Sequence, residues 1–184
     1  VTHLMGTAVF QEVNPLLATP IWASELPLPW VYRRCHFEVI SESTRADLMQ
    51  RGFAGDRLHV VHCGMDRRTY RVDPAAAKTD EPSLVYVGRI KRYKGIDQAI
   101  RALALVRRQL PTCTLTVVGD GDGLPGLQAL TQSLGLERAV LFAGFVPSAE
   151  KVRLLQTAHL LVNPSAKEGW GLTNVEANAC GTAC

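Results

Sequence analysis

Three features are missing from the sequence, and each absence narrows the class of protein. No apolar run is long enough to cross a bilayer, so no membrane-spanning helix is expected. The 20 Lys and Arg residues are scattered rather than striped and leave a formal charge of only +3, so nucleic acid is not an expected partner. The five cysteines contain no Cys-x-x-Cys pair, so neither a disulfide framework nor a zinc site is indicated. Together these absences favour a protein of the reducing cytoplasm.

The remaining composition is that of an ordinary globular protein. Of the 184 residues, 47% are hydrophobic and 20% are charged, which provides enough apolar material for a sizeable core. From residue 84 to residue 181, apolar runs typical of buried parallel strands alternate with segments of helical period. This order predicts an α/β fold with a Rossmann-like parallel sheet, right-handed crossovers and helices on both faces. The expected strands are 37–41, 58–62, 84–88, 114–118, 140–143 and 159–162, and the expected helices are 44–51 (capped by Ser43), 96–110, 124–134, 148–158 (capped by Ser148) and one from about residue 171.

The most informative stretch runs from Glu168 to Glu176, with seven residues between the two carboxylates. It follows an apolar run, so it predicts the end of a strand, a tight loop and the N-terminus of a helix. The unpaired N–H groups and the dipole of a helix start can hold a phosphate, and Gly169 and Gly171 let the backbone approach a ligand closely. Carboxylates on either side of that phosphate can accept hydrogen bonds from hydroxyl groups. A ligand with hydroxyls on both sides of a phosphate is a sugar nucleotide.

This stretch resembles the Glu-x7-Glu motif of the retaining GT-B glycosyltransferases of family 4, also described as glycosyl transferases group 1. The segment 174–182 resembles that family's continuation, a helix of small residues ending in Gly-Thr/Val-Pro, although Ala183 stands where proline is usual. By this resemblance, Glu168 binds the hydroxyls of the donor sugar and Glu176 binds the ribose. The backbone that would meet the distal phosphate and the sugar is that of Gly169, Gly171, Leu172 and Thr173.

Basic residues follow the strand expected at 84–88. Gly88-Arg89 and Lys94-Gly95 place charge at the carboxyl edge of the sheet, where open α/β sheets bind ligands. This pattern resembles the Gly-Arg…Lys-Gly element of the same family, whose Arg and Lys hold the diphosphate. A departing nucleoside diphosphate gains negative charge, which Arg89 and Lys94 would stabilise. The resemblance therefore implies no metal, and no cofactor apart from the nucleotide-sugar substrate.

A Gly-x-Gly-x-x-Gly pattern at residues 121–126 tests an alternative, a dinucleotide site. Such a site needs an acidic residue about 20 positions further on, at the end of the next strand, and the strand at 140–143 ends in Gly144 instead. NAD is therefore rejected as the ligand. Gly119, with Gly121 and Gly123, is expected to line the phosphate or nucleotide side of the cleft. Phe145 and Val146 lie in a stretch that resembles the family loop whose backbone reads the base.

The first stretch of the chain carries weaker indications. His3 matches, in residue type and rough position, a family histidine that would hydrogen-bond the donor sugar or the acceptor, but a structural or exposed histidine explains it equally. Four prolines within residues 13–32 are expected to break the helices there into short pieces. Trp22 and Trp30 in the same stretch would mostly pack, and they would otherwise line an acceptor site or rest on a membrane surface. Peripheral contact with the cytoplasmic face of a membrane thus stays open.

Composition also predicts the domain organisation. We expect residues 1–70 to be the end of an N-terminal acceptor domain and residues 83–184 to be a nucleotide-sugar-binding domain, truncated at its C-terminal end. Residues 71–82, which are polar and without apolar period, would be the interdomain linker and contain the hinge. The chain is thus expected to be a fragment of a two-domain protein, and whether the fragment is active by itself is open.

The predicted function is transfer of a hexose from a nucleotide-diphosphate sugar to an acceptor, with retention of configuration and without a metal. Two alternatives remain open: a sugar-nucleotide epimerase or hydrolase of the same fold, and a non-catalytic module that binds sugar nucleotides. The base, the sugar and the acceptor, whether saccharide, lipid or small molecule, leave no identifiable side-chain pattern.

Overall fold

The computed structural model describes residues 4, 6–166, 168 and 170–184. Their contacts divide them into two compact units. The N-terminal unit comprises Val1–Gly64 together with Glu168–Trp170, and the C-terminal unit comprises Met65–Lys167 together with Gly171–Cys184. No helix among the described residues has the length and apolar character needed to cross a membrane.

The N-terminal unit is built on a small parallel sheet. Strand β1 (Phe37–Val39) pairs with β2 (Leu58–Val60), and helix α4 (Glu42–Gln50) makes the crossover between them. The core of this unit consists of Val39, Leu48, Phe53 and Leu58. The helical elements that precede or interrupt this βαβ unit are η1 (Gly6–Ala8), α1 (Val9–Glu12), α2 (Pro15–Glu25), α3 (Leu28–Val31) and η2 (Gly55–Arg57).

The prolines break the helices less than expected. Pro15 is the first residue of α2, where its missing N–H costs nothing, and the Oδ1 of Asn14 accepts from Leu16 N at 3.0 Å to cap that helix. Pro20 lies inside α2, yet α2 is 11 residues long and ends only at Glu25. Because Leu16 is 84% exposed, water can reach the Leu16 carbonyl that Pro20 leaves without a donor.

Two of the predicted N-cap residues are wrong, one by two positions and the other by one. Helix α4 starts at Glu42 rather than at Thr44, and its N-cap is Ser41, whose Oγ accepts from Thr44 N at 3.1 Å. Ser41 has an extended backbone and is buried, whereas Ser43 is a residue of the first turn of α4. In the C-terminal unit, Ser148 is the first residue of its helix and Pro147 is the cap.

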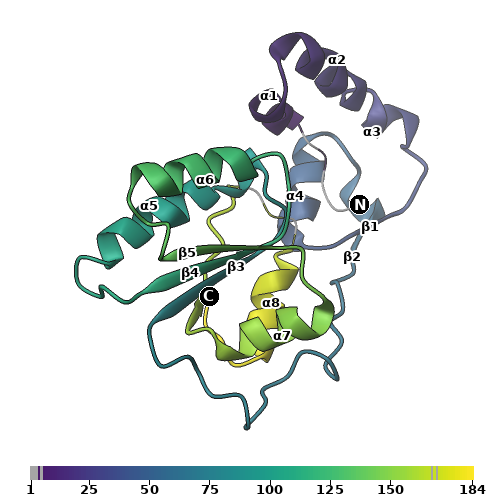
Figure 1. Cartoon of the computed structure of the whole chain (residues 1–184). Coiled ribbons are helices and arrows are strands. Elements are labelled where there is room, and N and C mark those ends of the chain that lie inside the picture. The colour runs from purple at the N-terminus through teal and green to yellow at the C-terminus, as the bar shows by residue number, and fades with distance from the viewer. Residues whose placement is uncertain (1–3, 5, 167, 169) are drawn as a thin grey trace. The chain divides into compact units, whose positions relative to one another are not determined.

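The C-terminal unit is a four-stranded parallel sheet with helices on both faces, which confirms the expected fold class. The strand order is β5 (Val140–Gly144), β4 (Thr114–Val118), β3 (Ser83–Val87) and β6 (Leu160–Leu161), and an isolated bridge joins Leu160 to Ala183 beyond β6. Helices α5 (Ile96–Val106) and α6 (Leu124–Ser133) cover one face, and α7 (Ser148–Thr157) and α8 (Leu172–Ala179) cover the other (Figure 1). A short helix, η3 (Arg92–Lys94), precedes α5.

Each face of the sheet has its own hydrophobic core. Tyr86, Leu115 and Val117 point toward α5 and α6, where Ile100 and Leu103 are fully buried. Val85 and Val118 point to the other side and pack with Leu155 of α7 and Ala177 of α8. Residues on β3 and β4 are therefore buried on both faces, which explains their nearly continuous apolar sequence.

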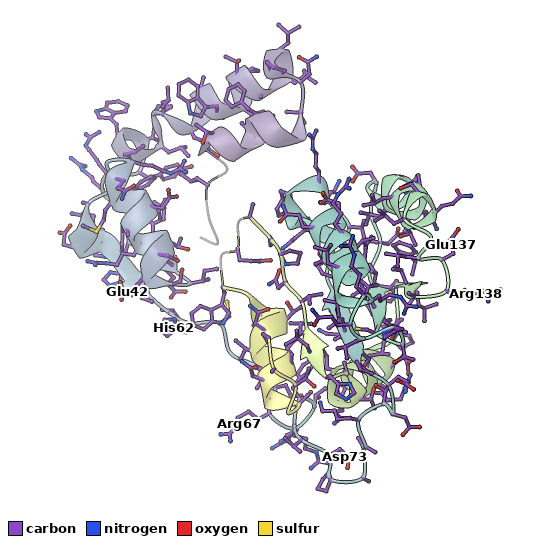
Figure 2. All side chains as sticks on the ribbon, turned by 90° about the vertical axis from the view of Figure 1, so that its left-hand side faces the viewer. Glu42, His62, Arg67, Asp73, Glu137 and Arg138 are labelled. Atoms are coloured by element: carbon purple, nitrogen blue, oxygen red, sulfur yellow. The ribbon has the colours of Figure 1, made fainter. Side chains whose placement is uncertain are left out.

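The segment that follows Met65 is attached to α7. Gln156 Nε2 of α7 donates to the Arg71 carbonyl at 2.9 Å, and Thr79 N donates to the Thr157 carbonyl at 3.0 Å. Lys78 Nζ donates to the Ala158 carbonyl and to Thr182 Oγ1, each at 2.6 Å. Asp73 lies in a turn of this segment (Figure 2), and its Oδ1 accepts from Ala75 N. By contact, the whole predicted linker of residues 71–82 belongs to the C-terminal unit, and the domain boundaries themselves stay a prediction.

Candidate functional site

The topology of the C-terminal sheet marks one edge as the ligand-binding edge. From β3 the chain adds β4 and β5 on one side, and then returns to place β6 on the other side of β3. Such a reversal leaves a crevice at the carboxyl ends of the strands. The residues at those ends are Gly88 and Arg89 after β3, and Gly119 and Asp120 after β4.

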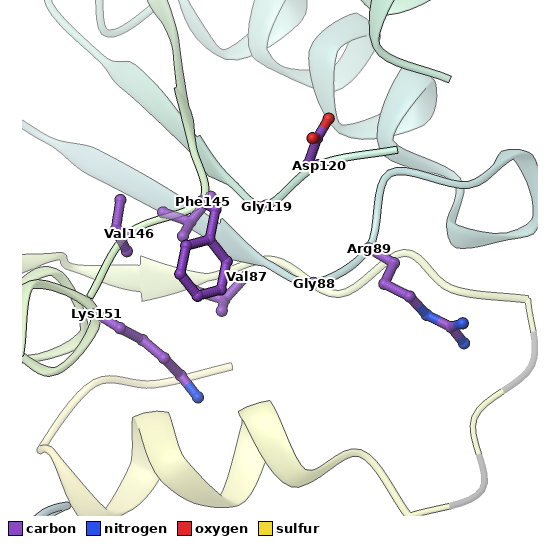
Figure 3. A pocket seen from close by; sticks show the side chains of 9 residues that line it. Val87, Gly88, Arg89, Gly119, Asp120, Phe145, Val146 and Lys151 are labelled. Carbon is purple, nitrogen blue, oxygen red and sulfur yellow. The ribbon is translucent and has the colours of Figure 1, made fainter. Parts of the chain in front are cut away.

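A pocket of about 320 Å³ opens at this edge (Figure 3). Its floor is formed by the ends of β3 and β4, and its rim by the loop after β5 and by the first turn of α7. Figure 3 shows the side chains of Lys151 and Arg89 at opposite ends of the pocket. The lining residues are Val87, Gly88, Arg89, Val118, Gly119, Asp120, Phe145, Val146 and Lys151.

Backbone carbonyl groups close to Gly119 and Gly121 require glycine at both positions. Gly119 lines the pocket, and its φ of 130° together with the nearby Gly88 carbonyl oxygen leaves no room for a Cβ. A Cβ on Gly121 would overlap the carbonyl oxygen of Ile90. Gly121 thus lets two loops pack against each other, and its expected contact with a ligand phosphate stays a prediction. Backbone packing thus explains Gly121 in the Gly-x-Gly-x-x-Gly pattern, whereas a Cβ on Gly126 would meet nothing within 4 Å.

Glu176 is held by a cation. It lies in the middle of α8, its side chain is 12% exposed, and its Oε2 is 2.7 Å from Lys151 Nζ on α7. This ion pair lies off the direction of a well-formed hydrogen bond, and no other described residue bonds to this buried oxygen. Lys151 Nζ also donates to Tyr70 Oη at 3.0 Å and lies 5.0 Å from the centre of the Tyr70 ring.

The electrostatics of Lys151 follow from these contacts. Burial by itself would lower the pKa of Lys151, but the Glu176 carboxylate and then the Tyr70 hydroxyl raise the pKa above its ordinary value. Lys151 is therefore positively charged at neutral pH. Its ammonium group is fixed between two partners on the wall of the pocket.

Arg89 and Lys94 both lie beside Tyr93. Arg89 is exposed, and its Nη2 is 3.2 Å from Tyr93 Oη, while Lys94 Nζ lies 5.2 Å from the centre of the Tyr93 ring. The turn between them is fixed because Gly95, at φ 65°, packs against the carbonyl of Pro164 and Tyr93 O accepts from Ala166 N at 3.1 Å. Only Arg89 lines the pocket itself. The structure thus places both predicted diphosphate ligands in the loop after β3.

The predicted loop and helix of the Glu-x7-Glu motif are divided between the two units. Gly171, at φ 74°, is the N-cap of α8, and the helix starts at Leu172 as expected. Asn163 Nδ2 donates to Asn174 Oδ1 at 3.1 Å, which ties the start of α8 to the end of β6. Glu168 is exposed and groups with Trp170 in the N-terminal unit. Gly169 and His3 lie outside the described residues.

The N-terminal unit holds Trp170 by a ring contact. Its indole stacks on the His62 imidazole, with ring centroids 4.6 Å apart and planes 22° apart, and His62 follows β2 (Figure 2). His62 Nδ1 also lies 3.2 Å from the Ile40 carbonyl oxygen. This contact agrees with the grouping of Trp170 with the N-terminal unit.

The loop that is expected to read the base carries an exposed aromatic ring. Phe145 is 88% exposed although it lines the pocket, and Val146 beside it is half-buried. A planar apolar surface at the mouth of a pocket can stack on a flat ring. Thr173, in the first turn of α8, is half-buried.

Asp120-Gly121-Asp122 has the Asp-x-Asp spacing at which two carboxylates can share a divalent cation. In the structure they are engaged separately: Asp122 Oδ2 pairs with Lys91 Nζ at 2.8 Å, and Asp120 Oδ1 accepts from Gly121 N at 2.7 Å. The hydrogen bond from Lys91 holds the pKa of Asp122 below its ordinary value. No cluster of three or more His, Cys, Asp or Glu side chains suited to a metal occurs in the part of the chain that the structure describes.

Sequence reasoning missed Lys151, Tyr70 and Asp120 as residues of the site. Lys151 lies in the first turn of α7, only five positions after Val146. A helix that follows a strand begins at the carboxyl edge of the sheet, so a cation in its first turn is a signal that could have identified Lys151. No local pattern marks Tyr70, because the segment that contains it has neither apolar period nor motif.

Comparison with known proteins now identifies the class. The fold, an α/β sheet with helices on both faces, is that of the GT-B glycosyltransferases. A structure of sucrose-phosphate synthase from Thermosynechococcus elongatus superposes with a TM-score of 0.80 at 26% identity, over 98% of this chain and 47% of that one. The Anabaena HepE structure in complex with UDP-glucose gives a TM-score of 0.77 at 24% identity, over 86% of this chain and 47% of that one, and supports the fold alone.

The family follows from the sequence comparison. Residues 68–184 match the model of the family described as Glycosyl transferases group 1, and the chain belongs to that family. It is 34% identical over 157 residues to a D-inositol 3-phosphate glycosyltransferase of Segniliparus rotundus. The match covers 78% of this chain and 35% of that relative. The chain thus spans about a third of that relative's length and about half of the two structures.

Proposed function

We propose that this chain carries the donor-binding part of a retaining, metal-independent glycosyltransferase of family 4. The substrate class is a nucleotide-diphosphate sugar, and the reaction moves its sugar to an acceptor hydroxyl. The observation that carries the proposal is the pocket at the carboxyl ends of β3 and β4, with Arg89 at one end and Lys151, the partner of Glu176, at the other.

The chemistry of that pocket fits a nucleotide. Its walls are apolar where Val87, Val118 and Phe145 line it, which suits a base and a sugar ring. Glu176 offers a carboxylate to ribose hydroxyls. Arg89 and Lys94, in the loop after β3, supply the positive charge for a diphosphate.

In the proposed reaction the bond between the anomeric carbon and the phosphate oxygen breaks while a bond to the acceptor oxygen forms on the same face. The departing phosphate takes the acceptor's proton. Arg89 and Lys94 stabilise the charge that develops on the diphosphate, and the backbone around Gly171 and Leu172 faces the distal phosphate and the sugar. Glu168 holds hydroxyls of the transferred sugar in this proposal.

The remaining expectations stay predictions. His3 would contact the donor sugar or the acceptor. Cytoplasmic location and contact with a membrane surface are likewise untested; the exposed side chains of Leu16 and Trp30, with Arg33 5.1 Å from the Trp30 ring, are the features that a membrane surface would meet. The acceptor is not indicated by any described residue.

Calorimetric titration with UDP, GDP and ADP, each with and without EDTA, tests the proposal. We expect one nucleoside diphosphate to bind, with the same affinity in the presence of EDTA. Loss of binding in the presence of EDTA would contradict the proposal that the site works without a metal. Asp120 and Asp122 would then be the candidate metal ligands. No binding of any of the three would overturn the proposed donor site in this chain.

A further inference from the structure

Glu176 is a carboxylate whose side chain is nearly buried, so it needs a partner there. The side chain is 12% exposed and its Oε2 is fully buried, so a ligand could reach the carboxylate only at Oε1. A carboxylate inside a protein that lacks a counter-ion tends to turn away toward water, because burial of an unpaired charge is unfavourable. Turned away, it would be a poorer acceptor for ribose hydroxyls.

Lys151 supplies the counter-ion, and it comes from a different helix. Its Nζ is 2.7 Å from Oε2, the buried oxygen of the carboxylate. The Tyr70 hydroxyl accepts from the same ammonium group at 3.0 Å, and the Tyr70 ring lies beneath it. These two contacts fix the ammonium group between α8 and the segment that follows Met65.

We infer that Lys151 is a positioning residue for the ribose-binding carboxylate, holding Glu176 in the orientation that leaves Oε1 for the ribose hydroxyls. The inference rests on the proposed function, since it assigns to Lys151 a part in recognising the donor nucleotide. Lys151 need not touch the ribose for this role. Its effect reaches the ligand through Glu176.

The alternative is that Lys151 acts only through its charge on the pocket wall, where it attracts the diphosphate. That effect would strengthen binding of every nucleoside diphosphate equally, whatever its sugar. A positioning role through Glu176 would instead appear only when the ribose hydroxyls are present. The ratio of affinities for a ribonucleotide and for its 2′,3′-dideoxy analogue therefore separates the two roles.

The experiment measures this ratio calorimetrically on the whole chain, with whichever of UDP, GDP or ADP binds most tightly. The unchanged protein should prefer the ribonucleotide by about tenfold or more, since a hydrogen bond to a charged group is lost in the analogue. Lys151→Met should reduce the preference to about threefold or less, and Lys151→Arg should keep most of it. In a Glu176→Gln background, adding Lys151→Met should leave the preference unchanged.

Arg153→Met is the matched control, because Arg153 is on the same helix and forms an exposed pair with Glu150 at 2.6 Å. It should leave the preference as it is. If Lys151→Met fails to fold in a thermal melt, Lys151→Gln replaces it, with the same expected loss of preference.

The outcomes are distinct. A Lys151→Met or Lys151→Gln variant that binds both nucleotides more weakly but keeps the full preference would overturn the inference. Equal binding of the ribonucleotide and the dideoxy analogue by the unchanged protein would overturn the ribose assignment of Glu176 and this inference with it. No binding of any nucleotide would instead overturn the proposed function.

Discussion

At the scale of single residues, the two carboxylates of the Glu-x7-Glu motif have different surroundings. Glu176 is nearly buried and paired with Lys151, whereas Glu168 is exposed and belongs by contact to the N-terminal unit. Glycine also has contrasting roles at this scale. Gly119 is required by its backbone conformation and by the Gly88 carbonyl beside it, while Gly126 has open space around it.

Replacing the two carboxylates should separate nucleotide recognition from sugar recognition. Glu176→Ala removes hydrogen bonds worth roughly 1.5–3 kcal/mol and should weaken nucleoside diphosphate binding about tenfold or more. Glu168→Ala should leave that affinity within about twofold and reduce the affinity for the intact nucleotide sugar by a similar 1.5–3 kcal/mol. Calorimetric titration of both variants with both ligands provides the comparison. Unchanged nucleotide affinity in Glu176→Ala would contradict the ribose assignment.

Gly119→Ala should destabilise the C-terminal unit by about 2 kcal/mol or more, because the new Cβ meets the Gly88 carbonyl oxygen in a conformation unfavourable to alanine. Gly126→Ala is the control within the same unit. Gly126 lies inside α6 with nothing near its missing Cβ, so alanine should stabilise by about 0.5–1 kcal/mol. Thermal denaturation followed by far-UV circular dichroism measures both changes, and equal stability of the two variants would refute the explanation for Gly119.

At the scale of elements, helix ends show how closely local chemistry can locate a boundary. The sequence places the start of α4 near two serines, and only Ser41 has the extended backbone that lets its side chain turn back to Thr44 N. The Ser43 side chain instead contacts the Ser41 hydroxyl at 2.9 Å. A correct helix can therefore be predicted with the wrong cap.

The cap assignment makes a paired prediction. Ser41→Ala should lower the free energy of unfolding of the N-terminal unit by about 1 kcal/mol, and Ser43→Ala should change it by less than about half of that. All three tryptophans, Trp22, Trp30 and Trp170, lie in this unit, so the fluorescence of a denaturant titration reports its unfolding. A larger effect at Ser43 than at Ser41 would show that the helix starts two residues later.

At the scale of the whole molecule, the segment after the N-terminal unit is anchored along α7 rather than free. Lys78 is tied to the Ala158 carbonyl and the Thr182 hydroxyl, whereas Arg67 and Arg68 are exposed near the point where the contacts divide, between Gly64 and Met65. Burial lowers the pKa of Lys78, which fits an ammonium group withdrawn from water.

Limited trypsin digestion should therefore cut after Arg67 or Arg68 well before it cuts after Lys78. The protease must take the basic side chain into its own pocket, and Lys78 would first have to release Ala158 and Thr182. Mass spectrometry of the early fragments identifies the first cut. Lys78→Arg keeps a residue after which trypsin can cut, and the order of the cuts should stay the same. Early cutting after Lys78 would show that the segment is loosely held.

The amino-acid sequence by itself determined the alternation of strands and helices from Leu84 onward. Apolar periodicity is set by residues close together in the chain and does not depend on which elements pack against each other. It also located the Gly88-Arg89 and Glu168–Glu176 motifs, since their spacing is carried by the chain itself. Only the tertiary structure decided that Lys151 meets both Glu176 and Tyr70, residues that lie 25 positions or more from it in the chain. Contacts of that kind depend on how α7 and α8 pack on the sheet and where the segment after Met65 runs, and no local pattern encodes those choices.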